Sequence, residues 1–86
     1  MKITIDKTEF DGIGYFESEG MLYMSMLPNK LSLDEIENLV RSNKSITCGE
    51  ETFTGYTDLD AISFTYHTRV DAKSTATALN IQTRRS

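Results

Sequence analysis

The stretch LSLDEIENLVRSN, residues 31–43, contains the clearest local signal in this sequence and decides the fold class. Ser32 followed three residues later by Glu35 forms a capping box, which predicts that a helix begins here. The apolar residues recur at helical spacing and predict a single stripe that packs on a sheet: Leu33, Ile36, Leu39 and Val40. We therefore expect one amphipathic helix over about residues 32–42.

The ends of this helix carry further signals. Leu31 and Ile36 stand at the positions of a hydrophobic staple. The first turn is acidic and Arg41 lies near the end, as the helix dipole favours. Asn43 is expected to end the helix as a left-handed cap.

The segments on both sides of the helix have the alternating pattern of strands. Residues 2–6 alternate, and residues 9–27 predict a hairpin that turns at Ser18-Glu19-Gly20. Gly12 and Gly14 predict a bulge or bend in its first arm. Four more strands are expected at residues 45–49, 51–57, 60–70 and 74–85. The expected fold is a single α+β domain over residues 1–86: a curled or two-layer antiparallel sheet of about six or seven short strands, with the helix packed on it.

Size and composition restrict the function. A chain of 86 residues buries only about 60–65 % of its unfolded surface, so there is little room for a deep active site. Its 38 % apolar and 26 % charged residues are typical of a globular domain. No apolar run resembles a signal peptide or a membrane span, and we expect the protein in the cytoplasm of the producing bacterial cell, or incorporated in a virion.

Charge is distributed unevenly along the chain. Residues 1–60 carry twelve acidic and five basic residues, whereas residues 61–86 carry one acidic and four basic residues. The net charge of −4 disfavours direct binding to nucleic acid. An acidic surface would instead suit a basic protein partner.

The residues that could support catalysis do not form a complete set. The single cysteine, Cys48, is expected in the core, and the single histidine, His67, is expected to be an ordinary strand residue. One cysteine and one histidine cannot build a structural zinc site. We therefore expect no enzyme activity, no cofactor and no metal.

The stretch GYTDLDAISFTY, residues 55–66, contains the pair Asp58-x-Asp60, which is a fragment of a calcium loop. The alternative is a turn at residues 57–60 that leads into a core strand with Ile62, Phe64 and Tyr66 pointing inward. We prefer the turn, because Leu59 would pin the loop to the core. A weak divalent-cation site is the less favoured interpretation.

Aromatic and methionine residues in the strands allow two interpretations. Most aromatics are expected to pack in the core, although stacked aromatics on a sheet can also hold bases or sugars. Residues 21–27 carry apolar groups on both faces of their strand, which predicts either a central strand or an interface. Candidate interface residues are Met21, Tyr23, Met24, Met26, Asp58 and Asp60.

The order of parts resembles small accessory proteins encoded among the phage and prophage structural genes of Gram-positive and gut bacteria. The resemblance rests on the opening KITI, the helix LSLDEIENLV and the run Tyr56, Leu59, Ile62. It implies a virion accessory or assembly component without a cofactor, and it identifies no functional residue. The basic ending NIQTRRS departs from the acidic tails expected in such proteins.

Three functional hypotheses follow. The first is a non-enzymatic protein that acts by protein–protein interaction, with itself or with a virion or host protein, as a homo-oligomer or in a virion. The second is an acidic, anti-CRISPR-like inhibitor of a host nucleic-acid-binding defence protein. It requires that seven carboxylates gather on one surface: Asp11, Glu17, Glu19, Glu50, Glu51, Asp58 and Asp60. The third is a weak metal-dependent hydrolase that uses Asp58 and Asp60.

Overall fold

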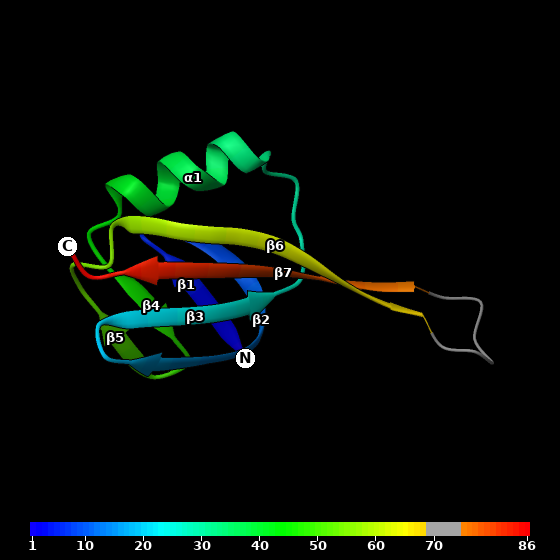
Figure 1. Ribbon diagram of the computed structural model, residues 1–86, viewed down its shortest axis with the longest axis horizontal. Coiled ribbons are helices and arrows are strands. Elements are labelled where there is room, and N and C mark those ends of the chain that lie inside the picture. The colour runs from blue at the N-terminus through cyan, green and yellow to red at the C-terminus, as the bar shows by residue number, and fades with distance from the viewer. Residues whose placement is uncertain (69–74) are drawn as a thin grey trace.

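Seven antiparallel strands and one helix are seen in the computed structural model, which describes residues 1–68 and 75–86, with the backbone alone at 66–68, 75 and 76. The strand order is β5-β4-β1-β2-β3-β7-β6, and the sheet is strongly curled but not closed (Figure 1). This confirms the mixed α+β class. The elements are β1 (Lys2–Ile5), β2 (Thr8–Ser18), β3 (Met21–Met26), α1 (Leu33–Ser42), β4 (Ile46–Cys48), β5 (Glu51–Phe53), β6 (Asp58–Thr68) and β7 (Thr75–Arg84).

The hairpin between β2 and β3 turns where the sequence predicts it. Ser18 pairs with Met21, which leaves Glu19 and Gly20 as a two-residue loop. Both have positive φ angles, 52° and 78°, as a type I′ turn requires. The short turn fixes the register of the whole hairpin.

Strand β2 joins the two halves of the sheet. Its first part pairs with β1, and its second part pairs with β3. At the start of the part that pairs with β3, the register shifts between Gly12 and Gly14, which confirms the predicted bulge. A bulge bends its strand and increases the local twist. One half-sheet is therefore β5-β4-β1-β2 and the other is β2-β3-β7-β6.

Helix α1 begins as predicted. The Glu35 backbone N–H donates to Ser32 Oγ at 3.2 Å, and the Ser32 backbone N–H donates to Glu35 Oε1 at 3.0 Å. Ile36 and Val40 are buried and Leu39 packs beside them. Leu33 was predicted to belong to this stripe, but it is 48 % exposed. It lies in the first turn, beyond the edge of the core.

The predicted left-handed cap at Asn43 is wrong. Asn43 has φ −66° and ψ 146°, an extended conformation that leads directly toward β4. Its buried side-chain amide donates to the carbonyls of Val40, at 2.6 Å, and Tyr56, at 2.8 Å. The helix end is thus held by a side chain rather than by a left-handed backbone.

The core lies inside the curl of the sheet, and α1 covers its open side. Inward-facing residues alternate along each strand, and the helix supplies two more. The buried apolar residues are Ile3, Ile5, Phe10, Leu22, Met24, Met26, Ile36, Val40, Ile46, Cys48, Tyr56, Ala78, Leu79 and Ile81.

The two C-terminal strands, β6 and β7, form a hairpin that projects beyond the rest of the fold (Figure 1). β6 and β7 pair from Asp58 and Arg84 at one end to Thr68 and Thr75 at the other. The sequence predicted these two strands. The side chains of Tyr66 and His67, for which inward and ordinary polar positions were predicted, lie outside the described residues.

Candidate functional site

The most distinctive surface of the molecule is the outer face of β2, β3, β7 and β6, the face that points away from the core. We call it the outer face. Its residues form rows in register across the four strands. One row is Phe16, Tyr23, Gln82 and Ala61, and the next is Gly14, Ser25, Asn80 and Ser63.

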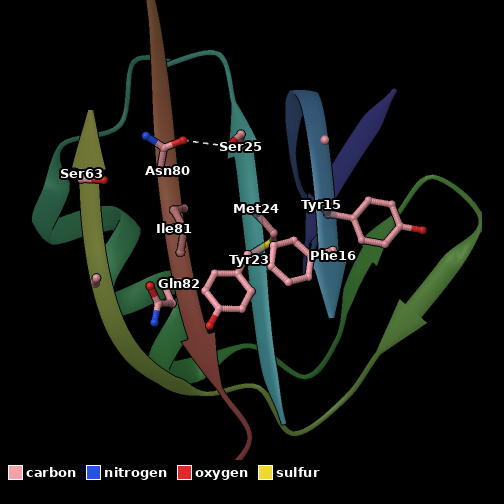
Figure 2. Close-up of a pocket in the computed structure, with 11 residues that line it drawn as sticks. Tyr15, Phe16, Tyr23, Met24, Ser25, Ser63, Asn80, Ile81 and Gln82 are labelled. Atoms are coloured by element: carbon pink, nitrogen blue, oxygen red, sulfur yellow. Dashed lines mark hydrogen bonds between the residues drawn. The ribbon is translucent and has the colours of Figure 1, made fainter. Parts of the chain in front are cut away.

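A shallow groove of about 310 Å³ follows these two rows (Figure 2). The rings of Phe16 and Tyr23 stack beside it with centroids 4.5 Å apart and planes 13° from parallel. Gly14 leaves the groove open because it has no side chain, and an added Cβ would meet nothing within 4 Å. Phe16 is 58 % exposed, an unusual position for a phenylalanine.

A second hollow of about 360 Å³ continues the groove toward the projecting hairpin. The two hollows share Ser25 and Asn80. Ile13 and Leu27 line the second hollow and are 57 % and 45 % exposed. Together with Phe16 they form a line of exposed apolar side chains along one face of the sheet.

The polar side chains on this face bond to one another. Ser25 Oγ donates to Asn80 Oδ1 at 2.7 Å, and Asn80 Nδ2 donates to Thr65 Oγ1 at 2.7 Å. These bonds hold a cross-strand row of neutral groups in place. The bonded row therefore combines neutral polar groups with the apolar side chains of this face.

Charged residues lie only at one end of the described outer face. Asp60 Oδ2 accepts from Gln82 Nε2 at 2.9 Å, and its Oδ1 is 3.4 Å from an Arg84 guanidinium nitrogen. Asp58 lies opposite Arg84 in the ladder. Among the described residues that line the groove, tyrosine is the only ionisable type.

The structure divides the six predicted interface residues into two groups. Tyr23 lies on the outer face, Met21 is half-buried beside it, and Asp58 and Asp60 are exposed at its charged end. Met24 and Met26 must be removed from the prediction, because they are 2 % and 0 % exposed and belong to the core. The strand does carry apolar groups on both faces, but alternation places these two methionines inward.

The Asp58-x-Asp60 pair lies in a strand rather than in a turn. β6 begins at Asp58, and a register shift between Leu59 and Ala61 leaves Asp60 at a bulge. Both carboxylate oxygens of Asp60 already have partners. In the described part of the chain, no three carboxylate, cysteine or histidine side chains come together as metal ligands would. This geometry does not favour the hydrolase hypothesis.

The carboxylates that the inhibitor hypothesis needs do not form one surface. Asp11 lies opposite Lys2, at the other end of the fold from the β2–β3 turn that carries Glu19. Arg84 pairs with Met21 at that turn and ion-pairs with Asp60, so a base lies between the acidic groups. The Arg85 backbone N–H bonds to Gly20 at the same turn, at 2.8 Å.

A row of aromatic side chains connects parts of the curl that share no strand ladder. Tyr15 and Phe53 meet edge to face at 6.0 Å, and Phe53 meets Tyr56 in the same way at 5.9 Å. The Arg85 guanidinium lies 5.0 Å from the centre of the Tyr56 ring. Tyr56 is fully buried although no strand contains it, whereas the sequence placed it at the end of one.

Tyr15, at one end of this row, and the nearby Cys48 both have raised pKa values. The Tyr15 hydroxyl donates to Glu51 at 2.6 Å, and this bond to a carboxylate raises the pKa of Tyr15 to about 12. Burial, with a smaller effect of Glu51, raises the pKa of Cys48 to about 11. The Cys48 side chain is fully buried, which confirms its predicted core position, and its thiol stays protonated at neutral pH.

The sequence did not single out Ile13, Phe16 or Leu27 as surface residues. A signal for Phe16 was present, because a two-residue turn at Glu19-Gly20 places it opposite Tyr23. No such signal existed for Ile13, whose outward position depends on the bulge between Gly12 and Gly14.

No known protein family, curated protein or solved structure matches this chain. Among its described residues there is no helix with the length and apolar character needed to cross a membrane. The fold and the outer face therefore define the protein only by class: a small α+β domain with a partly apolar sheet face whose described charged residues lie at one end.

Proposed function

We propose that this protein is non-enzymatic and acts by protein–protein interaction, with the outer face as its contact surface. The observation that carries the proposal is the line of exposed apolar side chains at Ile13, Phe16 and Leu27. Large apolar groups that are continuous on a surface are typical of interaction sites.

The composition of the outer face supports a protein partner. Aromatic residues are enriched at protein interfaces, and charged residues are depleted at their centres. Phe16 and Tyr23 line the groove, while the described charged groups Asp58, Asp60 and Arg84 lie at one end of the outer face. This arrangement corresponds to an apolar centre with a charged rim.

We further propose that the partner belongs to a phage or prophage assembly: another copy of the chain, or a virion or host protein. This proposal rests on the sequence resemblance to virion accessory proteins. In such a role the outer face would be covered in the assembly.

The test uses Phe16→Ser with Leu33→Ser as its matched control. Leu33 is also a large, exposed apolar residue, but it lies on α1. Cross-linking in the producing cell, followed by mass spectrometry, should identify the same partner with the unchanged protein and with Leu33→Ser. Phe16→Ser should lose it, since removing a central aromatic anchor costs about 2 kcal/mol or more of binding free energy.

Equal capture of that partner by all three proteins would refute the outer face as the contact surface. Circular dichroism of both variants should match the unchanged protein, because neither side chain is part of the core.

A further inference from the structure

The rings of Phe16 and Tyr23 form a flat platform on the outer face. Their planes are 13° from parallel with centroids 4.5 Å apart, and Figure 2 shows both rings with a face toward the viewer. Phe16 is 58 % exposed, so the platform is open to solvent. The face of an aromatic ring carries partial negative charge and attracts the weakly positive C–H groups of a ligand. The platform therefore suits a ligand ring that has C–H groups on one face.

Side-chain amides and hydroxyls lie directly beside this platform. Gln82 is opposite Tyr23 in the strand ladder. The next row of the outer face supplies three more polar side chains: Ser25, Asn80 and Ser63. Residues two positions apart along a strand are separated by about 7 Å, so one small ligand can contact both rows.

These polar groups are held in position and still have hydrogen-bonding capacity. Ser25 Oγ donates to Asn80 Oδ1 at 2.7 Å, and Gln82 Nε2 donates to Asp60 Oδ2 at 2.9 Å. Each side-chain amide has two N–H donors and an oxygen with two lone pairs. The bonds within the protein, including the one from Asn80 to Thr65, use only part of this capacity. Both amides therefore keep a donor and an acceptor position for a ligand.

The groove is lined by neutral side chains. None of its described lining residues is aspartate, glutamate, lysine, arginine or histidine. Anionic ligands are held mainly by arginine and lysine side chains, and the net charge of −4 repels anions at long range. The ligand that suits this groove is therefore neutral, rich in hydroxyl groups and apolar on one face.

We propose that the groove of the outer face binds a neutral saccharide. A sugar ring in its chair form has C–H groups on its faces and hydroxyl groups around its rim. Its C–H face stacks on the platform, while its hydroxyl groups exchange hydrogen bonds with Gln82, Asn80 and Ser63. The groove, of about 310 Å³, lies at the lower end of the range for small-ligand sites, about 300–1,000 Å³. Because the groove is shallow, the binding should be weak.

The first test is an NMR titration of the unchanged protein with three neutral disaccharides: cellobiose, mannobiose and diacetylchitobiose. Titration to about 10 mM covers affinities in the millimolar range. At least one disaccharide should shift the side-chain amide signals of Asn80 and Gln82 together with the backbone signals of the groove. The signals of α1 and β5 should stay in place. If none of the three shifts the groove signals, the proposal is overturned.

The second test compares Tyr23→Leu with Leu27→Ala as its control. Tyr23→Leu keeps an apolar side chain but removes the ring, so it should weaken binding of the disaccharide about fivefold or more, as expected when a stacking contact is lost. Leu27 is also an apolar residue of the outer face, but it lines the second hollow and not the groove. Leu27→Ala should therefore bind the disaccharide as the unchanged protein does. Equal affinities for Tyr23→Leu and the unchanged protein would contradict the stacking.

Saccharide binding and the protein contact proposed above can fail separately. Groove signals that shift with a disaccharide, combined with equal capture of the partner by Phe16→Ser, would support the saccharide site and refute the protein contact. Loss of the partner in Phe16→Ser without any shift of the groove signals would refute the saccharide site and support the protein contact.

Discussion

Tyr15 lies in the part of β2 that pairs with β3 alone, where the two halves of the sheet separate. Its hydroxyl reaches Glu51, 36 positions away in the sequence, and its ring packs against Phe53. One side chain thus connects β2 to β5 although no backbone ladder joins these strands.

The hydrogen bond from Tyr15 to Glu51 should lose its stabilising effect at high pH. The pKa of Tyr15 is raised from 10.0 to about 12, so its proton is held more tightly in the folded protein than in the unfolded chain. The bond therefore stabilises the fold fully below pH 10 and loses its effect as the pH rises toward about 12. Urea unfolding of the unchanged protein and Tyr15→Phe should show a difference in stability that shrinks over this interval.

Glu51→Gln provides the control, since it keeps the side-chain shape and removes the carboxylate. Its stability relative to Tyr15→Phe should not depend on pH in this way. A constant difference between the unchanged protein and Tyr15→Phe across the interval would show that the bond is absent in solution.

Single residues were predictable when their signals were local. Cys48 was placed correctly because a lone cysteine in a strand is most often a core residue. Asn43 was not, because the carbonyl of Tyr56, which binds its amide, lies 13 residues away. The same applies to Tyr56, whose burial depends on Phe53 and on Arg85.

At the scale of elements, the bulge in β2 depends on one glycine more than on the other. A Cβ at Gly12 would lie 2.7 Å from Ile3 Cγ1, and Ile3 is fully buried in the adjacent strand. At Gly14 the same atom would meet nothing within 4 Å.

Gly12→Ala should therefore destabilise the protein by about 1–3 kcal/mol, because the core must shift to admit a methyl group. Gly14→Ala should change stability by no more than about 0.5 kcal/mol. Urea unfolding followed by circular dichroism measures both. Equal effects of the two substitutions would mean that the close contact with Ile3 does not exist.

The helix and the β2–β3 hairpin were predictable because their capping box, apolar spacing and turn residues lie within a few positions of one another. The residues at which β5 ends and β6 begins could not be predicted in this way. Residues 51–57 were expected to be one strand, but β5 ends at Phe53 because Tyr56 turns into the core. Tertiary packing overrides local pattern at such boundaries.

At the scale of the whole molecule, the sequence predicted one α+β sheet but could not predict its strand order. The pairing of β3 with β7 joins residues that are far apart in the chain, and nothing local specifies it. The outer face depends on this pairing, since β7 supplies Asn80 and Gln82. For this reason the sequence predicted Met21 and Tyr23 as interface residues but could not predict the outer face to which they belong.

The pairing of β3 with β7 has a consequence for the order of folding. Leu22, Met24 and Met26 pack against Leu79 and Ile81, so the N-terminal hairpin cannot bury its apolar side until residues 79–84 are available. Domains rich in such distant contacts fold slowly, over about milliseconds to seconds. During synthesis on the ribosome, β1, β2 and β3 emerge well before β7, so their apolar residues stay accessible to chaperones until β7 pairs with β3 and completes the core.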